Sequence, residues 1–156
     1  MPADPEPMYE LTRDQLATQL SFVDALDTKI GLFLSVGSGL VGILAAVLAL
    51  HPSSIGHPDF RALVACVGAY ILVAGAGGFG LWSRAWGLGP DPRVVAKDYN
   101  KTSGDAVRRR MAAKFNQDYE ANLTAYRHKL WALRLTLVGL VIETLALVAA
   151  LASLAA

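Results

Sequence analysis

The sequence predicts an all-α integral membrane protein with three transmembrane helices, a helix before the first span and a helical cytoplasmic connector before the last. Hydrophobic residues make up 54% of the 156 residues and charged residues only 17%, whereas soluble domains average about 25% charged residues. Three segments, 30–50, 62–82 and 130–156, also meet the length of about 20 apolar residues that a bilayer core requires. The alternative is a soluble bundle, but its helices would keep a polar stripe.

Composition excludes several other classes of protein. The formal net charge is only +1, from 14 basic and 13 acidic residues, so a nucleic-acid partner is not expected. Cys66 is the single cysteine, which excludes a disulfide scaffold, and the apolar content excludes disorder. The predicted partner is therefore the lipid bilayer.

Residues 1–29 are predicted to be a cytoplasmic helix that leads directly into the first span. Three prolines among the first seven residues favour an irregular start. Thr12 with Gln15 fits a capping box, and apolar residues then recur at helical spacing from Leu16. We therefore expect this helix to begin at about Thr12.

The connector, 83–129, opens with a linker rich in glycine and proline. Asp91-Pro92 is typical of a helix start, with an N-cap followed by proline at the first helical position. Asp105 is the predicted cap of a longer helix, whose apolar residues step by three or four from Val107 onward. Because no proline follows, this helix is predicted to continue unbroken through the third span, on the order of 75 Å.

Basic residues predict the orientation. The segment 84–129 contains ten Lys and Arg residues and 1–29 contains two, but the hairpin 51–61 contains one. Basic loops stay in the cytoplasm, so we expect a multi-pass protein with a cytoplasmic N-terminus. Residues 1–29 also carry six acids, whereas the connector is net basic. The two parts are expected to dock on one another, with anionic lipid or an anionic ligand as alternatives for the basic residues.

Glu143 is the candidate functional residue within the membrane. An ionisable group near the middle of a span costs about 2.5–3.5 kcal/mol on insertion scales. One interpretation is an acid that lines a pore or relays protons, with Tyr70 and Ser35 as further intramembrane polar groups. The structural alternative is a protonated Glu143 that is hydrogen-bonded to Ser35, Ser38 or Tyr70.

Small residues predict close packing of the spans. Residues 75–80 match the letters of a dinucleotide-binding G-x-G-x-x-G motif, but they lie within a span and not in a βαβ unit. Pairs of small residues four apart let membrane helices approach closely. The residues assigned to this packing are Gly31, Gly39, Gly78 and Gly80.

A group of polar residues is predicted at the cytoplasmic ends of the first and third spans. Asp27, Lys29, Asn122 and Lys129 should lie at similar depth, and an Asp27–Lys129 or Asp27–Arg134 contact is expected. Such a contact would be structural or would bind a ligand. The basic run Arg108, Arg109 and Arg110 would face solvent or lipid, or bind a phosphate group.

No catalytic site is predicted. The chain offers no paired nucleophile and base, so an enzyme is not expected, and no cofactor is assigned. His51, His57 and Asp59 in the outer hairpin match no metal-ligand spacing, so no metal site is assigned either.

The order of these parts resembles a known class of protein. Asp27-Thr-Lys29 at the first span, Gly89-Pro-Asp-Pro-Arg93 in the linker, and Asn122 with Lys129 seven residues later are similar to the Pycsar transmembrane effectors and the related SLATT domains. The resemblance implies a homo-oligomer in the bacterial inner membrane that disrupts the membrane when infection produces a cyclic nucleotide. The chain departs from that pattern because no separate nucleotide-sensing domain is recognisable in its sequence. Either the connector would bind the nucleotide, or the protein would respond to another trigger.

Three functions remain as hypotheses. The favoured one is an oligomeric effector that forms a pore in response to a cytoplasmic signal. The first alternative is a passive scaffold or accessory subunit of a membrane complex. The second is a membrane-anchored binding module that uses the basic connector helix.

Overall fold

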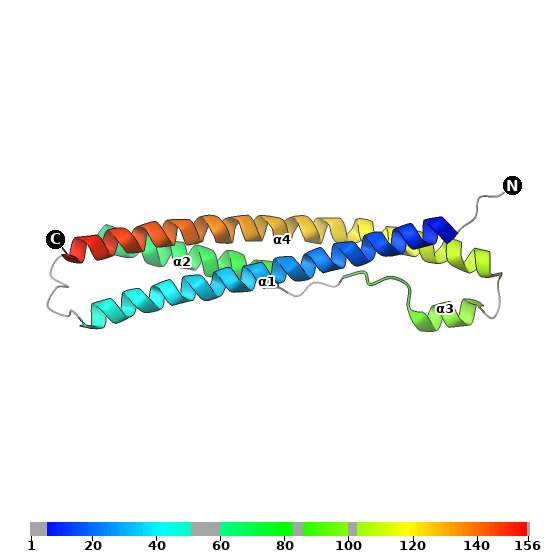
Figure 1. Cartoon of the computed structure of the whole chain (residues 1–156), viewed down its shortest axis with the longest axis horizontal. Coiled ribbons are helices and arrows are strands. Elements are labelled where there is room, and N and C mark those ends of the chain that lie inside the picture. Colours follow the sequence, from blue (N-terminus) through cyan, green and yellow to red (C-terminus); the bar gives the residue numbers. More distant parts are fainter. Residues whose placement is uncertain (1–5, 51–59, 83–85, 100–102, 156) are drawn as a thin grey trace. The chain divides into compact units, whose positions relative to one another are not determined.

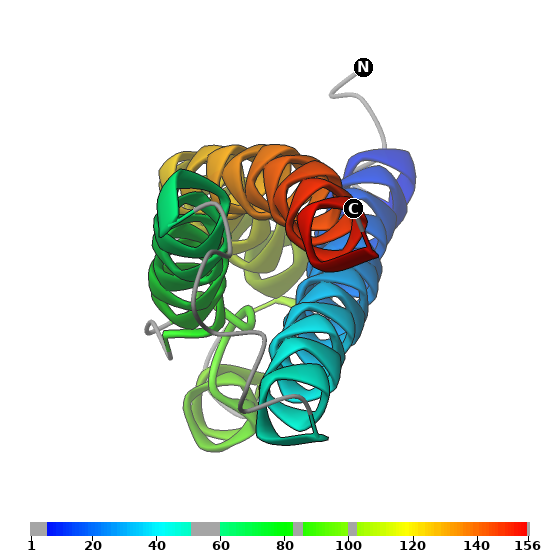
Figure 2. The ribbon, with the colours of Figure 1, turned by 90° about the vertical axis from the view of Figure 1, so that its left-hand side faces the viewer.

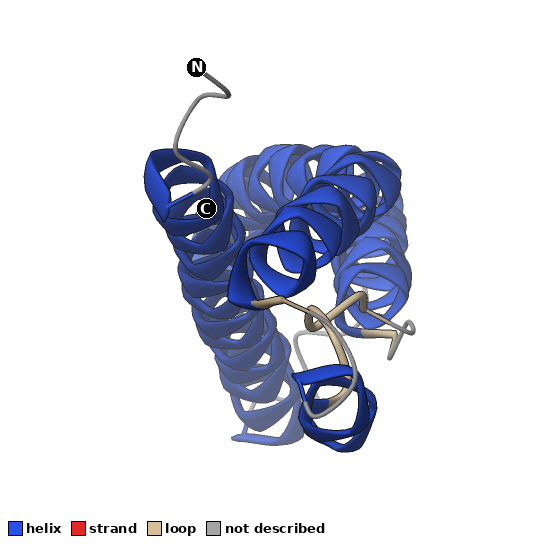
Figure 3. Cartoon of the chain, turned by 90° about the vertical axis from the view of Figure 1, so that its right-hand side faces the viewer, coloured by secondary structure: helices blue, strands red, loops and turns tan. Residues whose placement is uncertain are grey.

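The computed structural model describes residues 6–50, 60–82, 86–99 and 103–155. They form four helices, which are α1 (Glu6–Leu50), α2 (Phe60–Leu81), α3 (Pro92–Tyr99) and α4 (Gly104–Ala155) (Figure 1). The described residues contain helices and loops but no strand (Figure 3), which confirms the all-α class. The predicted outer hairpin falls mainly on residues 51–59, which lie outside the described part.

Three of the helices, α1, α2 and α4, are long and apolar enough to cross a membrane. They contain the predicted spans. Long apolar segments form helices because a helix satisfies every backbone polar group within the segment itself.

The start of α1 differs from the prediction. The helix begins at Glu6, because a proline in the first turn, here Pro7, loses no helical hydrogen bond. Thr12 is therefore inside the helix, and its hydroxyl donates to the carbonyls of Met8 at 2.9 Å and Tyr9 at 3.1 Å. The capping box predicted at Thr12 and Gln15 is wrong.

The predicted N-cap of α3 is confirmed, whereas the predicted N-cap of α4 is wrong. The Asp91 carboxylate accepts a hydrogen bond of 2.8 Å from the Arg93 amide, as predicted for an N-cap. At α4 the Ser103 carbonyl accepts from the amides of Ala106 and Val107, so the cap is Ser103 and Asp105 lies in the first turn. The predicted continuity is confirmed, since α4 runs 52 residues without a break, about 78 Å at the rise of an α-helix.

The chain divides into two compact units. The polar unit comprises Met1–Ala25 and Ser83–Arg127, and the apolar unit comprises Leu26–Trp82 and His128–Ala156. Both α1 and α4 contribute to each unit, whereas α2 belongs to the apolar unit and α3 to the polar unit.

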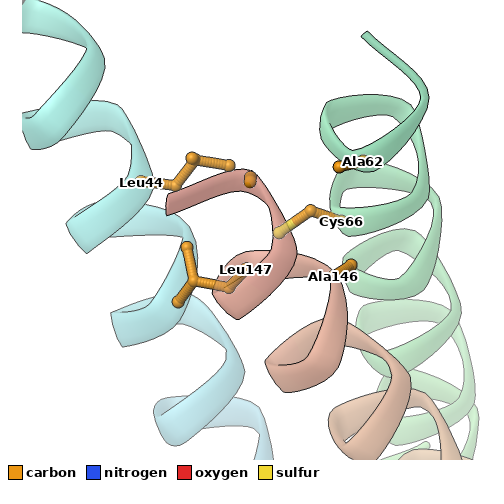
Figure 4. Packing of buried hydrophobic residues seen from close by; sticks show 6 residues of the cluster. Leu44, Ala62, Cys66, Ala146 and Leu147 are labelled. Carbon is orange, nitrogen blue, oxygen red and sulfur yellow. The ribbon is translucent and has the colours of Figure 1, made fainter. Parts of the chain in front are cut away.

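The core of the apolar unit lies between α1, α2 and α4. Figure 2 shows these stretches in cyan, green and orange to red, respectively. A cluster of buried apolar side chains joins the three helices, with Leu44 from α1, Cys66 from α2 and Leu147 from α4 (Figure 4). The side chains at Ala62 and Ala146 are small, so the helices approach closely there.

Buried positions recur every seven residues along each long helix. They are Leu16, Val23, Ile30, Gly37 and Leu44 on α1, Cys66, Val73 and Gly80 on α2, and Phe115, Asn122, Lys129, Thr136, Glu143 and Ala150 on α4. A seven-residue repeat keeps one seam of a helix facing its neighbours when helices wrap around one another. The seam of α4 is unusual because four of its members are polar.

Candidate functional site

The buried seam of α4 carries a ladder of polar side chains. Asn122, Lys129, Thr136 and Glu143 are each seven residues apart, and none is more than 5% exposed. Seven residues are two helical turns, so successive side chains are about 10.5 Å apart along the axis. Asn122, Lys129 and Glu143 are sequence-predicted site residues. Thr136 is not, although its 0% exposure follows from the same repeat.

Glu143 is fully enclosed by the apolar unit. Its exposure is 0%, and neither carboxyl oxygen has a hydrogen-bond partner among the described residues. Gly37 of α1 provides the space, because a Cβ atom there would lie 3.0 Å from Oε2 of Glu143 and 3.2 Å from a methyl group of Val73. One turn earlier on α4, Gly139 lies closer still to Val73, with 2.8 Å from its hypothetical Cβ to Cγ2.

The hydrogen bonds predicted for Glu143 are absent from this part of the structure. Ser35 and Ser38 donate to the carbonyls of Gly31 and Leu34 on their own helix, at 3.0 and 2.9 Å. The Tyr70 hydroxyl is 3.5 Å from that of Ser38. The structural alternative, with Glu143 bonded to one of these hydroxyls, is therefore wrong, because serines within a helix bond to the preceding turn.

The energetic consequence depends on the charge of Glu143. A neutral polar group without a partner costs a few kcal/mol when buried, whereas an isolated carboxylate costs tens of kcal/mol. The environment of Glu143 thus strongly favours the neutral form.

The predicted contact between the first and third spans is confirmed. The Lys129 ammonium donates to the Asp27 carboxylate in an ion pair. Lys129 is 5% exposed and the Asp27 side chain 37%, so the pair lies at the boundary of the buried region. Lys29 is exposed, and Arg134 instead stacks on Trp131, 5.5 Å from the ring centroid.

Asn122 attaches the linker to α4 in the polar unit. Its side-chain oxygen accepts from the Gly87 amide and its nitrogen donates to the Gly87 carbonyl, both at 3.0 Å. One turn earlier, Asp118 accepts from the Gly89 amide at 3.0 Å. Gly89 has a φ of +96°, a conformation that L-residues with a side chain rarely adopt. Both hydrogen-bonding ends of the Asn122 amide are thus used within the chain.

The acidic N-terminal segment docks on the basic connector, as expected. Arg108 forms an ion pair of 2.5 Å with Glu6, and the rings of Tyr9 and Phe115 lie 5.8 Å apart. Arg109 is exposed.

Arg110 lies at a cavity between α3 and α4. The cavity measures about 330 Å³. Its lining combines apolar side chains with two basic residues and one acid, and includes Val94, Val95, Met111, Arg110, Lys114 and Asp91. Lys114 also forms an ion pair of 2.6 Å with Asp118. An apolar lining with cations suits an anion that has an apolar part.

A second cavity, of about 430 Å³, lies between α1 and α4 in the polar unit. It contains Gln19, which sequence analysis missed. The Gln19 amide donates to the Tyr119 carbonyl at 3.2 Å, and its oxygen has no partner among the described residues. Phe22 and Tyr126 contribute aromatic lining.

The glycines assigned to helix packing fall into two groups. A Cβ on Gly80 would lie 2.8 Å from both Ala132 and Ile30, and one on Gly77 would lie 2.6 Å from Leu34. Gly80 therefore packs inside the apolar unit. In contrast, Gly31, Gly39 and Gly78 face open space, with nothing within 4 Å, so they are not used for packing within the described chain.

The described residues contain no group of three or more His, Cys, Asp or Glu side chains that could hold a metal ion. A comparison of the chain with known protein families, characterised proteins and solved structures finds no match. The geometry described above is therefore the basis for a functional proposal.

Proposed function

We propose that the chain is an oligomeric effector of the bacterial inner membrane that permeabilises the membrane when its polar unit receives a cytoplasmic signal. The observation that supports this function most directly is the continuity of α1 and α4. Each helix contributes to both units, so a ligand that changes their packing in the polar unit also acts on helices that are long enough to span a membrane.

The open glycine faces support assembly into a homo-oligomer. Gly31 and Gly39 of α1 and Gly78 of α2 have free space beside them. Exposed small residues allow a second membrane helix to approach at backbone distance. An assembly of several chains would provide the pore that three helices of one chain do not enclose.

The cavity at Arg110 is the proposed place for the trigger. A cyclic nucleotide, the trigger that the sequence resemblance implies, would present its phosphate to Arg110 and Lys114 and its base to the apolar lining. The N-terminus would be cytoplasmic in this arrangement, as the distribution of basic residues predicts.

The test is dye efflux from liposomes that contain the purified protein, with and without a panel of cyclic nucleotides. We expect efflux that depends on one of the nucleotides, that is lost in Arg110→Ala, and that is altered in Glu143→Ala without loss of insertion. Arg109→Ala, which changes an exposed neighbour, is the matched control. If the protein is inserted and oligomeric but no nucleotide causes dye efflux, the result would favour the scaffold function.

A further inference from the structure

Glu143 is the only ionisable side chain on α4 beyond Arg134, and like Thr136 in the apolar unit it is 0% exposed. We propose that Glu143 is a proton-binding site: the packed three-helix arrangement binds one proton at this carboxyl, and the helices must separate to release it. This inference does not depend on the proposed pore activity.

The ligand is a proton because the surroundings suit no larger cation. Gly37 adjoins the carboxyl and a methyl group of Val73 borders the same space, since a Cβ atom on Gly37 would lie 3.0 Å from Oε2 of Glu143 and 3.2 Å from Cγ1 of Val73. The hydroxyls along the same stretch, those of Ser35, Ser38, Thr136 and Thr144, each donate to a carbonyl of their own helix. A metal cation needs several oxygen ligands, whereas a proton needs one.

In the part of the chain that the structure describes, no cation pairs with the Glu143 carboxyl to compensate an ionised form. On α1 no ionisable side chain lies between Lys29 and the end of the helix, and on α4 Arg134 precedes Glu143 by nine residues, about 13 Å. The titratable groups of α2 that lie nearest are Cys66 and Tyr70, both uncharged when protonated, and Arg61 is exposed at the start of that helix. Ionisation therefore requires water or a new partner beside the carboxyl, which the packed helices exclude.

The first test identifies the proton. Infrared difference spectra of wild type minus Glu143→Gln, in lipid bilayers near pH 7, should contain the C=O stretching band of a protonated acid. Wild type minus Glu120→Gln is the matched control, because Glu120 is exposed and should lose a carboxylate band instead. A carboxylate band from Glu143 overturns the proposal. If Glu143→Gln does not fold, Glu143→Met, which is similar in size, gives the same comparison.

The second test measures the separation of the helices. Cys66, the only cysteine, is buried in the core that Leu147 and Ala146 share with it, so its rate of reaction with a membrane-permeant thiol reagent reports opening. The ratio of the rate in wild type to the rate in Glu143→Gln removes the effect of pH on the thiol that both proteins share. We expect this ratio to rise as the pH is raised. A ratio that stays constant across the pH range shows that proton release does not open the helices and overturns the coupling.

Discussion

Gly37 and Glu143 occupy adjoining space, since a Cβ atom on Gly37 would lie 3.0 Å from Oε2 of the carboxyl. A methyl group there must displace Glu143 or Val73. We expect Gly37→Ala to lower the free energy of unfolding by about 1–3 kcal/mol, the usual cost of overpacking. Unfolding in mixed micelles, followed by circular dichroism, measures the change.

Two variants control this prediction. Gly42→Ala adds the same methyl group to an exposed position of α1 where nothing lies within 4 Å, so it should change stability by no more than about 0.5 kcal/mol. Glu143→Ala should relieve the crowding, so the double variant Gly37→Ala/Glu143→Ala should be more stable than the sum of the single changes predicts. Strict additivity would contradict the contact.

The Asp27–Lys129 ion pair should stabilise the junction between α1 and α4. Asp27→Asn removes the carboxylate that accepts from Lys129, which is 5% exposed. Because Asp27 is partly exposed, we expect a loss of about 1–2 kcal/mol, between the values for surface and buried pairs. Equilibrium unfolding measures it, with Lys29→Ala as the control on an exposed neighbouring residue. Equal effects of the two substitutions would argue against a specific pair.

The attachment of the linker to α4 should depend on Asn122. Asn122→Ala removes the acceptor and the donor that pair with the Gly87 backbone, and each unsatisfied group costs about 1–3 kcal/mol. We expect faster hydrogen exchange at the amides of Gly87 and Gly89, and faster proteolysis between residues 86 and 91. Asn116→Ala, which removes only an exposed contact with Glu120, should leave both rates unchanged.

The two groups of glycines should respond differently to substitution. Leucine at Gly39 or Gly78 faces open space, so we expect normal helix content but a smaller assembly by light scattering in detergent. Gly80→Ala should instead destabilise the single chain, since its methyl group would lie 2.8 Å from Ala132 and Ile30. An unchanged assembly size in the leucine variants would contradict the proposed role of these faces.

Hydropathy and charge were sufficient to predict the helical elements. The spans follow from long stretches with little or no charge, and the continuity of α4 follows from the absence of proline after Asp105. The Asp27–Lys129 pair follows from placing both residues at the same depth. The helix starts were less predictable. Thr12 looks like a cap by sequence, but its hydroxyl bonds to the preceding turn, and Ser103 precedes Asp105 as the cap. Several neighbouring polar residues at a helix start can each serve as the N-cap, so the sequence does not identify which one does.

The candidate site was only partly predictable. Glu143 is conspicuous in an apolar segment, but its neighbour Gly37 is over one hundred residues away in the sequence, and pairing between helices depends on three-dimensional packing. The seven-residue repeat through Phe115, Asn122 and Glu143 is a signal that could have identified Thr136 as well. Asp118 and Gln19 lie on the charged parts of their helices. Polar residues are common there, so the sequence does not indicate which of them are buried.

The repeat on α4 also constrains how the chain can change in length. Deleting one residue between Lys129 and Thr136 would rotate everything that follows by about 100° relative to what precedes it. Glu143 would then turn from the interior toward the outer surface of the apolar unit, while Lys129 would keep its place against Asp27. Deleting seven residues would restore the angular phase. Insertions and deletions in this helix should accordingly be tolerated only when their length is close to a whole number of helical turns, such as about seven, eleven or eighteen residues.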